Sequence, residues 1–286
     1  MSMRQTGALL LLSALWGGSF LFMRIASPVL GPVLLIALRV SLAGLALLVH
    51  AAVTEGLPPL RTHWRPFLII GALNSALPFL LIATASLSLP ASLLATLNAT
   101  TPLFGALVAA RWGLEGLTGR TVAGILLGLV GVMTLVGIGP LAPTPAVLYS
   151  TAASLLAALS YGFAATYTKR AATGVSSQAL SLYSQLGASL LLLPLVPFTW
   201  PHKLPTLPVV LSVLALALLC TALGYRLYFY LIQTAGPTRA TLVTYLSPAF
   251  GMLWGALILG EPLGTGSFLG FGLILGSALL VSRKQR

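Results

Sequence analysis

Acidic residues are almost missing from this chain of 286 residues, which contains no Asp and only three Glu: Glu55, Glu115 and Glu261. Charged residues of both signs make up 6% of the sequence, against about 25% in soluble globular domains. Hydrophobic residues make up 58%, and the mean hydropathy is +1.02. A water-soluble fold has no interior large enough to hide so much apolar surface. The composition therefore excludes a soluble globular protein and indicates an integral membrane protein.

Cysteine and histidine are scarce as well. The single cysteine, Cys220, excludes an internal disulfide, and three scattered histidines form no metal-ligand pattern. We expect neither a metal site nor a cofactor. Enzymes embedded in membranes need paired carboxylates, a Ser/His arrangement or metal ligands, so this class is disfavoured. A structural or assembly factor remains a third alternative.

Basic residues outnumber acidic ones, fifteen to three, which gives a formal net charge of +12. In a soluble protein this imbalance would suggest nucleic-acid binding. Here the basic residues are scattered between apolar runs, as in the cytoplasmic loops of membrane proteins. The expected partner is therefore the lipid bilayer and not a nucleic acid.

Long apolar runs follow one another along the whole chain. A helix needs roughly 20 mostly apolar residues to cross a hydrocarbon core of about 30 Å. The first run, after Arg4, is longer than the apolar part of a signal peptide, about 7–15 residues, and is interpreted as a span. The predicted spans are residues 6–23, 31–53, 66–86, 91–110, 121–138, 146–167, 177–198, 208–232, 240–259 and 266–282.

The Lys and Arg residues between these spans predict the orientation. With a cytoplasmic N-terminus, eleven of them fall inside and two, Arg24 and Lys203, fall outside. Arg39 and Arg226 lie within spans. Because cytoplasmic loops are enriched in Lys and Arg, we expect both termini in the cytoplasm and an even number of spans.

The second half of the chain repeats the first. A shift of 146 residues aligns Asn74–Phe79 with Cys220–Tyr225, and a shift of 145 aligns Trp16-Gly17 with Tyr161-Gly162. The 146-residue shift also pairs Pro102 with Pro248, Gly105 with Gly251, Glu115 with Glu261 and Gly124 with Gly270.

The repeat divides the chain into residues 1–140 and 141–286, with five predicted spans each. Because five is odd, the halves must be inverted relative to each other in the membrane. The expected fold class is an all-α membrane protein of ten transmembrane helices in two inverted five-helix repeats, a construction that recurs in transporters with a midplane site between the repeats.

These motifs resemble the drug/metabolite transporter superfamily. The resemblance rests on Trp16-Gly17, on Arg39, on Pro102 followed thirteen residues later by Glu115, and on their partial duplication around Pro248 and Glu261. Specifically, the chain looks like the ten-helix EamA-type members and is most similar to the YddG-type amino-acid exporters. The resemblance implies a protein of the bacterial inner membrane that works as a monomer and exports small metabolites, often amino acids. The second half has Tyr161 in place of Trp16 and no obvious Arg equivalent to Arg39.

Polar side chains inside spans usually face the interior of a bundle. Asn98, Thr101 and Gly105 fall on one helical face, and the repeat places Ser247 and Gly251 likewise. Pro102 and Pro248 each free a carbonyl one turn earlier. Two interpretations stay open, a substrate cavity and close helix packing through small residues.

Aromatic residues form a second candidate set. The set comprises Trp16, Phe20, Phe79, Tyr161, Tyr225, Tyr245 and Trp254, of which Trp16, Tyr161 and Tyr245 lie well inside their spans and are favoured. Aromatic rings suit apolar or cationic substrates, although packing or anchoring at the membrane interface would explain each ring singly.

Four charged positions complete the candidates. Arg39 has no Glu inside any span to neutralise it, so it must rely on carbonyls, water, snorkelling or a substrate carboxylate. Arg226 is close enough to a span end to snorkel. Glu115 and Glu261 precede the spans at 121–138 and 266–282, where carboxylates complement the positive end of a helix. The predicted substrate-binding residues are Trp16, Arg39, Asn74, Phe79, Asn98, Thr101, Tyr161, Tyr245 and Ser247.

The expected function is export of a small metabolite, above all a neutral or aromatic amino acid, by alternating access around a central cavity. Export of drugs or quaternary cations is the alternative within transport. It is disfavoured because no span contains a fixed negative charge. No Asp, Glu or His is placed to carry a proton at the midplane, so we expect facilitated diffusion along the gradient of the solute.

Overall fold

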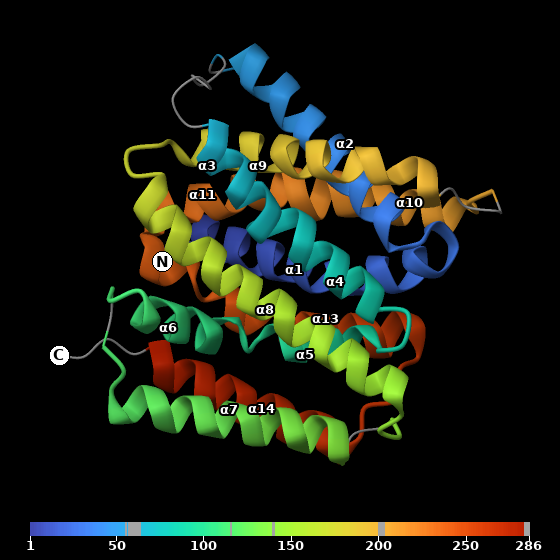
Figure 1. The fold of residues 1–286 in the computed structure, drawn as a ribbon, viewed down its shortest axis with the longest axis vertical. Coiled ribbons are helices and arrows are strands. Elements are labelled where there is room, and N and C mark those ends of the chain that lie inside the picture. Colours follow the sequence, from blue (N-terminus) through green and yellow to red (C-terminus); the bar gives the residue numbers. More distant parts are fainter. Residues whose placement is uncertain (55, 57–63, 115, 139–140, 200–203, 283–286) are drawn as a thin grey trace.

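A computed structural model of the chain describes residues 1–54, 56, 64–114, 116–138, 141–199 and 204–282 (Figure 1). Every regular element within these ranges is helical. In the first half they are α1 (Met3–Leu30), α2 (Pro32–Thr54), α3 (Trp64–Gly71), η1 (Ala72–Ala76), α4 (Leu77–Ala85), α5 (Ala91–Asn98), α6 (Thr101–Arg111) and α7 (Gly119–Gly137). In the second they are α8 (Pro145–Ala171), α9 (Ser177–Leu192), η2 (Leu193–Thr199), α10 (Leu207–Leu214), η3 (Ala215–Leu223), α11 (Gly224–Ala235), α12 (Pro237–Ala240), α13 (Val243–Leu259) and α14 (Thr265–Ser282).

Apolar helices dominate this architecture, as the sequence predicts. In the described ranges, eight helical segments are long and apolar enough to cross a membrane, and two shorter ones cover Val243–Leu259 and Thr265–Val281. The expected class of all-α membrane protein is confirmed, and each predicted span coincides with one of these segments.

The predicted end of the first span at residue 23 is wrong, because α1 continues to Leu30. Arg24 was expected to lie outside this span. It stays in the helix, and its guanidinium donates hydrogen bonds to the carbonyls of Ser86 and Leu87, at 2.6 and 3.0 Å. Because these carbonyls satisfy the N–H groups of its guanidinium, Arg24 does not need to reach water, and the helix can continue past it.

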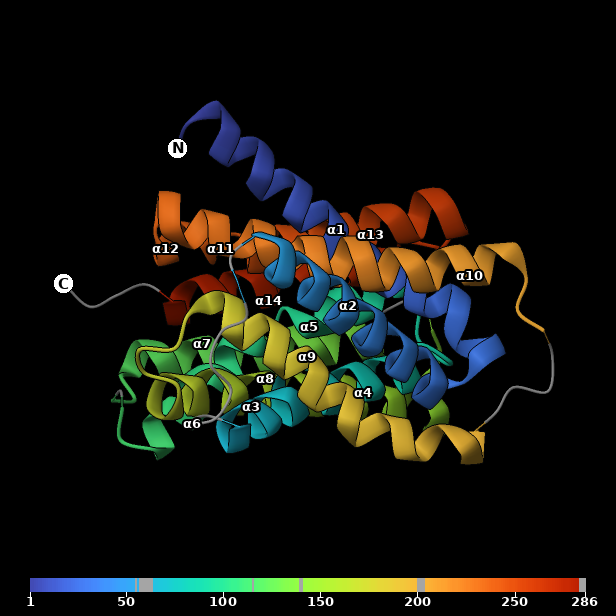
Figure 2. The ribbon, with the colours of Figure 1, turned by 90° about the horizontal axis from the view of Figure 1, so that it is seen from above.

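The start of α1 and the end of α14 lie at the same end of the bundle (Figures 1 and 2). The side-chain amide of Gln5 also donates to the carbonyl of Thr234, near the end of α11, at 2.9 Å. A shared end is what an even number of crossings requires. Its cytoplasmic placement stays a prediction from the distribution of Lys and Arg.

Two long segments change helix type near their middle. η1 and η3 are π-helical, and a 146-residue shift places η1 within η3. A π segment changes the backbone hydrogen-bond pattern and is frequent at functional sites. Both halves therefore carry the same irregularity at the same position.

The face predicted from Asn98, Thr101 and Gly105 is interrupted, because α5 ends at Asn98 and α6 begins at Thr101. Pro102 has no N–H to offer the carbonyl of Asn98. The hydroxyl of Thr101 donates to that carbonyl instead, at 2.7 Å. In the second half, Pro248 lies inside α13, and the break comes earlier, between α12 and α13.

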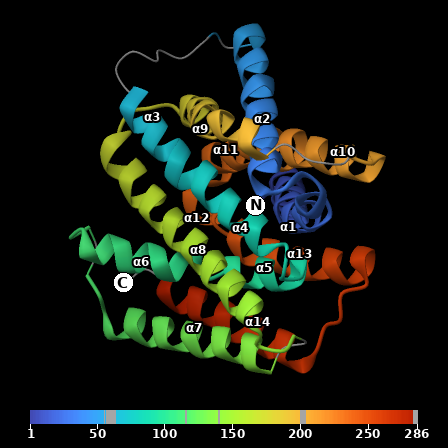
Figure 3. The same cartoon turned by 45° about the vertical axis from the view of Figure 1, so that its right-hand side comes forward.

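Glycines allow helices of different halves to approach closely. A Cβ added to Gly17 on α1 would lie 2.6 Å from the carbonyl oxygen of Ser247 on α13, and one added to Gly162 on α8 would lie 2.9 Å from the backbone nitrogen of Gly105 on α6. The same Cβ position on Gly17 lies 2.7 Å from the backbone nitrogen of Gly251. The two crossings therefore correspond, because the sequence shifts pair Gly17 with Gly162 and Gly105 with Gly251. α7 and α14 lie side by side away from these crossings (Figure 3).

Glu261 caps a different helix from the expected one. Its carboxylate accepts hydrogen bonds from the backbone N–H of Ala91 at 2.7 Å and from the N–H and hydroxyl of Ser92 at 3.0 and 2.8 Å. These groups begin α5, whereas the sequence suggested the following helix, α14. The structural role at the positive end of a helix is present, but it links the two halves. Glu115 lies outside the described residues.

Candidate substrate-binding site

Arg39 lies on α2 in the interior of the bundle, and only 4% of its surface is exposed. Its Nε donates to the hydroxyl of Thr221 at 3.0 Å, and its Nη1 is 3.8 Å from the sulfur of Met23. Its Cζ lies 3.7 Å from the ring centroid of Phe79, a cation–π contact. Arg39 therefore does not snorkel to a membrane surface.

No carboxylate neutralises this charge within the described part of the chain. Glu261 is the one Glu described there, and its two oxygens bond to the start of α5. The hydroxyl of Thr221 and the ring of Phe79 offset part of the desolvation of the guanidinium, but neither carries a formal negative charge.

Gln185 on α9 holds the equivalent position in the second half. It has no exposed surface, and its Nε2 donates to the hydroxyl of Ser75 at 2.9 Å. The 146-residue shift converts Arg39 into Gln185 and Ser75 into Thr221. The bond from Arg39 to Thr221 therefore has a counterpart in the bond from Gln185 to Ser75.

Tyr225 links the two halves of the site. The side-chain amide of Asn74 donates to its hydroxyl at 2.8 Å. Ser75 and Gln185 also lie near that hydroxyl. We call Arg39, Asn74, Ser75, Gln185, Thr221 and Tyr225 the central cluster. Phe79 packs on Arg39, and Tyr161 lies within electrostatic range of its charge.

The π segments position this cluster, because η1 carries Asn74 and Ser75 and η3 carries Thr221. Each segment also accepts a side-chain hydrogen bond from the first long helix of the other half. The indole N–H of Trp16 donates to the carbonyl of Cys220 at 3.1 Å, and the hydroxyl of Ser160 donates to the carbonyl of Leu73 at 2.7 Å. Trp16 thus braces η3.

The remaining predicted site residues lie on α5, α6 and α13. The Oδ1 of Asn98 is buried without a hydrogen-bond partner among the described residues. The hydroxyl of Thr101 donates to the carbonyl of Asn98 at the end of α5, and that of Ser247 donates to the carbonyl of Val243 at 2.8 Å. The hydroxyl of Tyr245 lies 3.4 Å from the carbonyl of Ala278 on α14. Of this group, Asn98 alone keeps an unpaired acceptor in the described structure.

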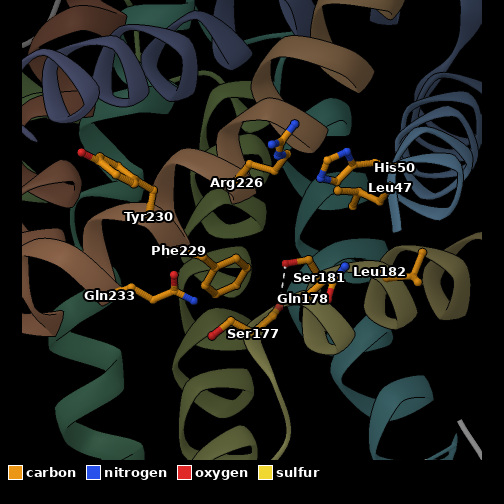
Figure 4. Close-up of a pocket in the computed structure, with 10 residues that line it drawn as sticks. All are labelled: Leu47, His50, Ser177, Gln178, Ser181, Leu182, Arg226, Phe229, Tyr230 and Gln233. Carbon is orange, nitrogen blue, oxygen red and sulfur yellow. Dashed lines mark hydrogen bonds between the residues drawn. The ribbon is translucent and has the colours of Figure 1, made fainter. Parts of the chain in front are cut away.

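A cavity of about 230 Å³ lies between α2, α9 and α11, toward the end that holds the start of α1. Its lining is Leu47, His50, Ser177, Gln178, Ser181, Leu182, Arg226, Phe229, Tyr230 and Gln233 (Figure 4). We call it the end cavity.

The described lining of the end cavity holds two basic side chains, His50 and Arg226, and no carboxylate. The ring of Phe229 stacks on Tyr225 of the central cluster, with centroids 6.1 Å apart. The end cavity therefore adjoins the central cluster. Sequence reasoning expected Arg226 only to snorkel and did not find this cavity.

Sequence reasoning missed Gln185, Ser75 and Thr221, and it named Tyr225 as an aromatic candidate but left it out of the predicted substrate-binding residues. A Gln in place of an Arg is no match when identical residues are sought. Applying the 146-residue shift to Arg39 itself leads directly to Gln185, so the signal was present.

A bundle of apolar helices with a buried polar cluster between its halves defines a multi-span transport protein. The sequence matches the EamA-like transporter family twice, over residues 6–137 and 149–283, and the chain belongs to that family. A solved crystal structure has the same fold, with a TM-score of 0.69 at 20% identity, covering 99% of this chain and 98% of the other.

Curated relatives agree with this assignment. The chain is 28% identical to the uncharacterized inner membrane transporter YedA of Escherichia coli strain K12, over 96% of this chain and 90% of that protein. It is 26% identical to the uncharacterized transporter YvbV of Bacillus subtilis, over 95% and 89%, and 26% identical to protein PecM of Dickeya dadantii, over 93% and 88%. These findings support a multi-pass inner-membrane transporter rather than an enzyme.

Proposed function

We propose that this transporter exports a neutral amino acid from the cell and that the central cluster binds it. One observation carries the proposal: the buried guanidinium of Arg39 has no carboxylate partner in the described structure. A charge at the centre of a membrane-spanning helix costs about 2.5–3.5 kcal/mol on insertion scales. A substrate carboxylate, held by the planar N–H groups of Arg39, would supply the missing negative charge.

The same charge argues against the alternative of a cationic drug. A fixed cation repels a quaternary ammonium ion, and the described site holds no carboxylate to attract one. The rings of Phe79, Tyr161 and Tyr225 would instead pack on the apolar side chain of an amino acid. One chain supplies residues from both halves, so a monomer is sufficient.

Access would alternate between the two ends of the bundle. The end cavity lies toward the end of the termini, whereas Glu261 ties the two halves together near the opposite end. With the predicted topology, this arrangement faces the cytoplasm. Rocking of residues 1–140 against residues 141–286, as inverted repeats around a central site, would then expose the cluster to the other side.

Energy coupling follows from the shortage of acids. The sequence has no Asp, and among the described residues the central cluster holds no Glu or His. A proton-driven carrier usually passes its proton through such a residue inside the membrane. The proposed mechanism is therefore facilitated diffusion, driven outward by the cell's own production of the amino acid.

Counterflow in proteoliposomes tests the substrate class. Vesicles preloaded with one unlabelled compound are given a trace of the same compound with a label, across a panel of amino acids, nucleosides and cationic dyes. We expect transient accumulation with neutral amino acids. Accumulation with the dyes alone would refute the proposal.

The same vesicles test the coupling. An imposed pH gradient without a substrate gradient should drive no accumulation above equilibrium. Accumulation several times above equilibrium would refute facilitated diffusion, and His50 in the end cavity would become the first residue to examine, together with Glu115 and Glu261.

A further inference from the structure

Gln185 combines complete burial with an unused hydrogen-bond acceptor. It has no exposed surface, and its Oε1 has no hydrogen-bond partner in the described part of the chain. Buried amide oxygens are nearly always bonded, because an unpaired one keeps the penalty of losing water. An unpaired acceptor inside a binding cluster indicates a donor on the ligand.

The opposite end of this amide is already engaged. Nε2 of Gln185 donates to the hydroxyl of Ser75, which lies on η1. The hydroxyl of Tyr225 lies near the same side chain. The bond to Ser75 orients the amide, and Oε1 is left without a partner among the described residues.

Arg39 and Gln185 therefore offer opposite functions from equivalent positions. Arg39 presents N–H donors and a positive charge, whereas Gln185 presents an unpaired acceptor. The two residues lie on the neighbouring helices α2 and α9, and Tyr225 is within range of both. A carboxylate accepts hydrogen bonds and an ammonium group donates them, so an α-amino acid matches this pair.

We propose that Oε1 of Gln185 binds the ammonium group of the substrate while Arg39 binds its carboxylate. This inference rests on the proposed function and adds to it a residue that determines specificity. Gln185 would separate amino acids from simple carboxylates, which Arg39 alone would accept. A neutral acceptor at this position also leaves Arg39 without an internal ion pair that would compete for it.

The test uses three compounds that share one ring: phenylalanine, 3-phenylpropionate, which lacks the ammonium group, and 2-phenylethylamine, which lacks the carboxylate. Each competes against counterflow of labelled phenylalanine in proteoliposomes. For the wild type we expect phenylalanine to compete at least about tenfold better than 3-phenylpropionate, as a hydrogen bond to a charged group predicts.

Gln185→Met keeps the length of the side chain and removes its acceptor. It should abolish the preference for phenylalanine over 3-phenylpropionate and leave competition by 3-phenylpropionate within about twofold of wild type. Ser75→Ala is the matched comparison, because it removes the hydrogen bond to Nε2 and keeps Oε1. It should retain more of the preference for phenylalanine than Gln185→Met does. If Gln185→Met weakens competition by phenylalanine and by 3-phenylpropionate equally, the inference is overturned.

Gln185→Glu provides a second variant if Gln185→Met does not reconstitute. It keeps an acceptor and adds a negative charge that attracts an ammonium group and competes with a substrate carboxylate for Arg39. The ratio of competition by 2-phenylethylamine to competition by 3-phenylpropionate should therefore rise at least about tenfold. An unchanged ratio would contradict the inference. The proposed function fails separately, when the wild type exchanges no amino acid at all.

Discussion

The two sides of the central cluster share a geometry and differ in charge. On one side Arg39 donates to Thr221 at 3.0 Å, and on the other Gln185 donates to Ser75 at 2.9 Å. Phe79 accompanies Arg39, and Tyr225, its partner under the 146-residue shift, accompanies Gln185. The difference teaches that a duplicated scaffold can hold an unsymmetrical ligand in one orientation, because only one side carries the cation.

Arg39→Gln makes the two sides alike and should have the largest effect. We expect counterflow to fall by about 100-fold, since a charge-assisted hydrogen bond to the substrate carboxylate is lost. The measurement is the initial rate per reconstituted protein. Arg39→Lys is the control for charge and should lose less. Wild-type counterflow by Arg39→Gln would show that the charge serves only the structure.

Exchanging the two residues should recover part of that loss. The double variant Arg39→Gln with Gln185→Arg moves the cation to the equivalent position, so we expect counterflow at least about fivefold above Arg39→Gln alone, within the range of strongly coupled pairs. The initial rates of both variants are compared in one preparation. A double variant that is no better than the single one would mean that the two positions are not equivalent for the substrate.

The glycine crossings should respond alike in both halves. Gly17→Ala and Gly162→Ala each place a methyl group against backbone of the partner helix, and we expect each to lower stability by about 1–3 kcal/mol. Thermal unfolding in detergent measures the loss. Gly7→Ala is the control, because a Cβ there meets nothing within 4 Å. A loss of stability in one of the two variants and a gain in the other would show that the two crossings are not equivalent.

Asn98 and Ser247 should differ, although the sequence repeat pairs their helix faces. Asn98 keeps a buried unpaired Oδ1, whereas the hydroxyl of Ser247 is bonded to its own helix. We expect Asn98→Leu to lower counterflow about fivefold with near-normal yield, as the loss of one hydrogen bond to the substrate implies. Ser247→Ala should leave counterflow within about twofold of wild type. A larger loss would indicate that Ser247 contacts the substrate.

The membrane-spanning helices could be predicted because hydropathy alone determines them. The end of α1 could not, since whether Arg24 finds carbonyls within reach depends on the neighbouring α4 and its following turn. The π segments have no pattern in the sequence, because they arise from packing. Hence Asn74 was predicted, but its partner Tyr225 was only one of several possible aromatic residues.

The predicted site residues come together only in part, for a related reason. Arg39 contacts Phe79 and lies within electrostatic range of Tyr161, and Asn74 bonds to Tyr225, whereas Thr101, Ser247 and Tyr245 contact backbone. The sequence alone does not distinguish a polar residue in a span that bonds to backbone from one that binds a ligand. Glu261 shows the limit for charges, because the backbone N–H groups that it caps lie 169 and 170 residues away along the chain.

Equilibrium binding tests the central claim most directly, with the purified protein and the labelled amino acid that counterflow selects. The account predicts saturable binding to the wild type, displaced by the free amino acid and not by its methyl ester, which has no carboxylate charge. It also predicts that Arg39→Gln weakens this binding by about 100-fold. Equal affinity of the wild type and Arg39→Gln, or displacement by the ester as strong as by the acid, would contradict the account.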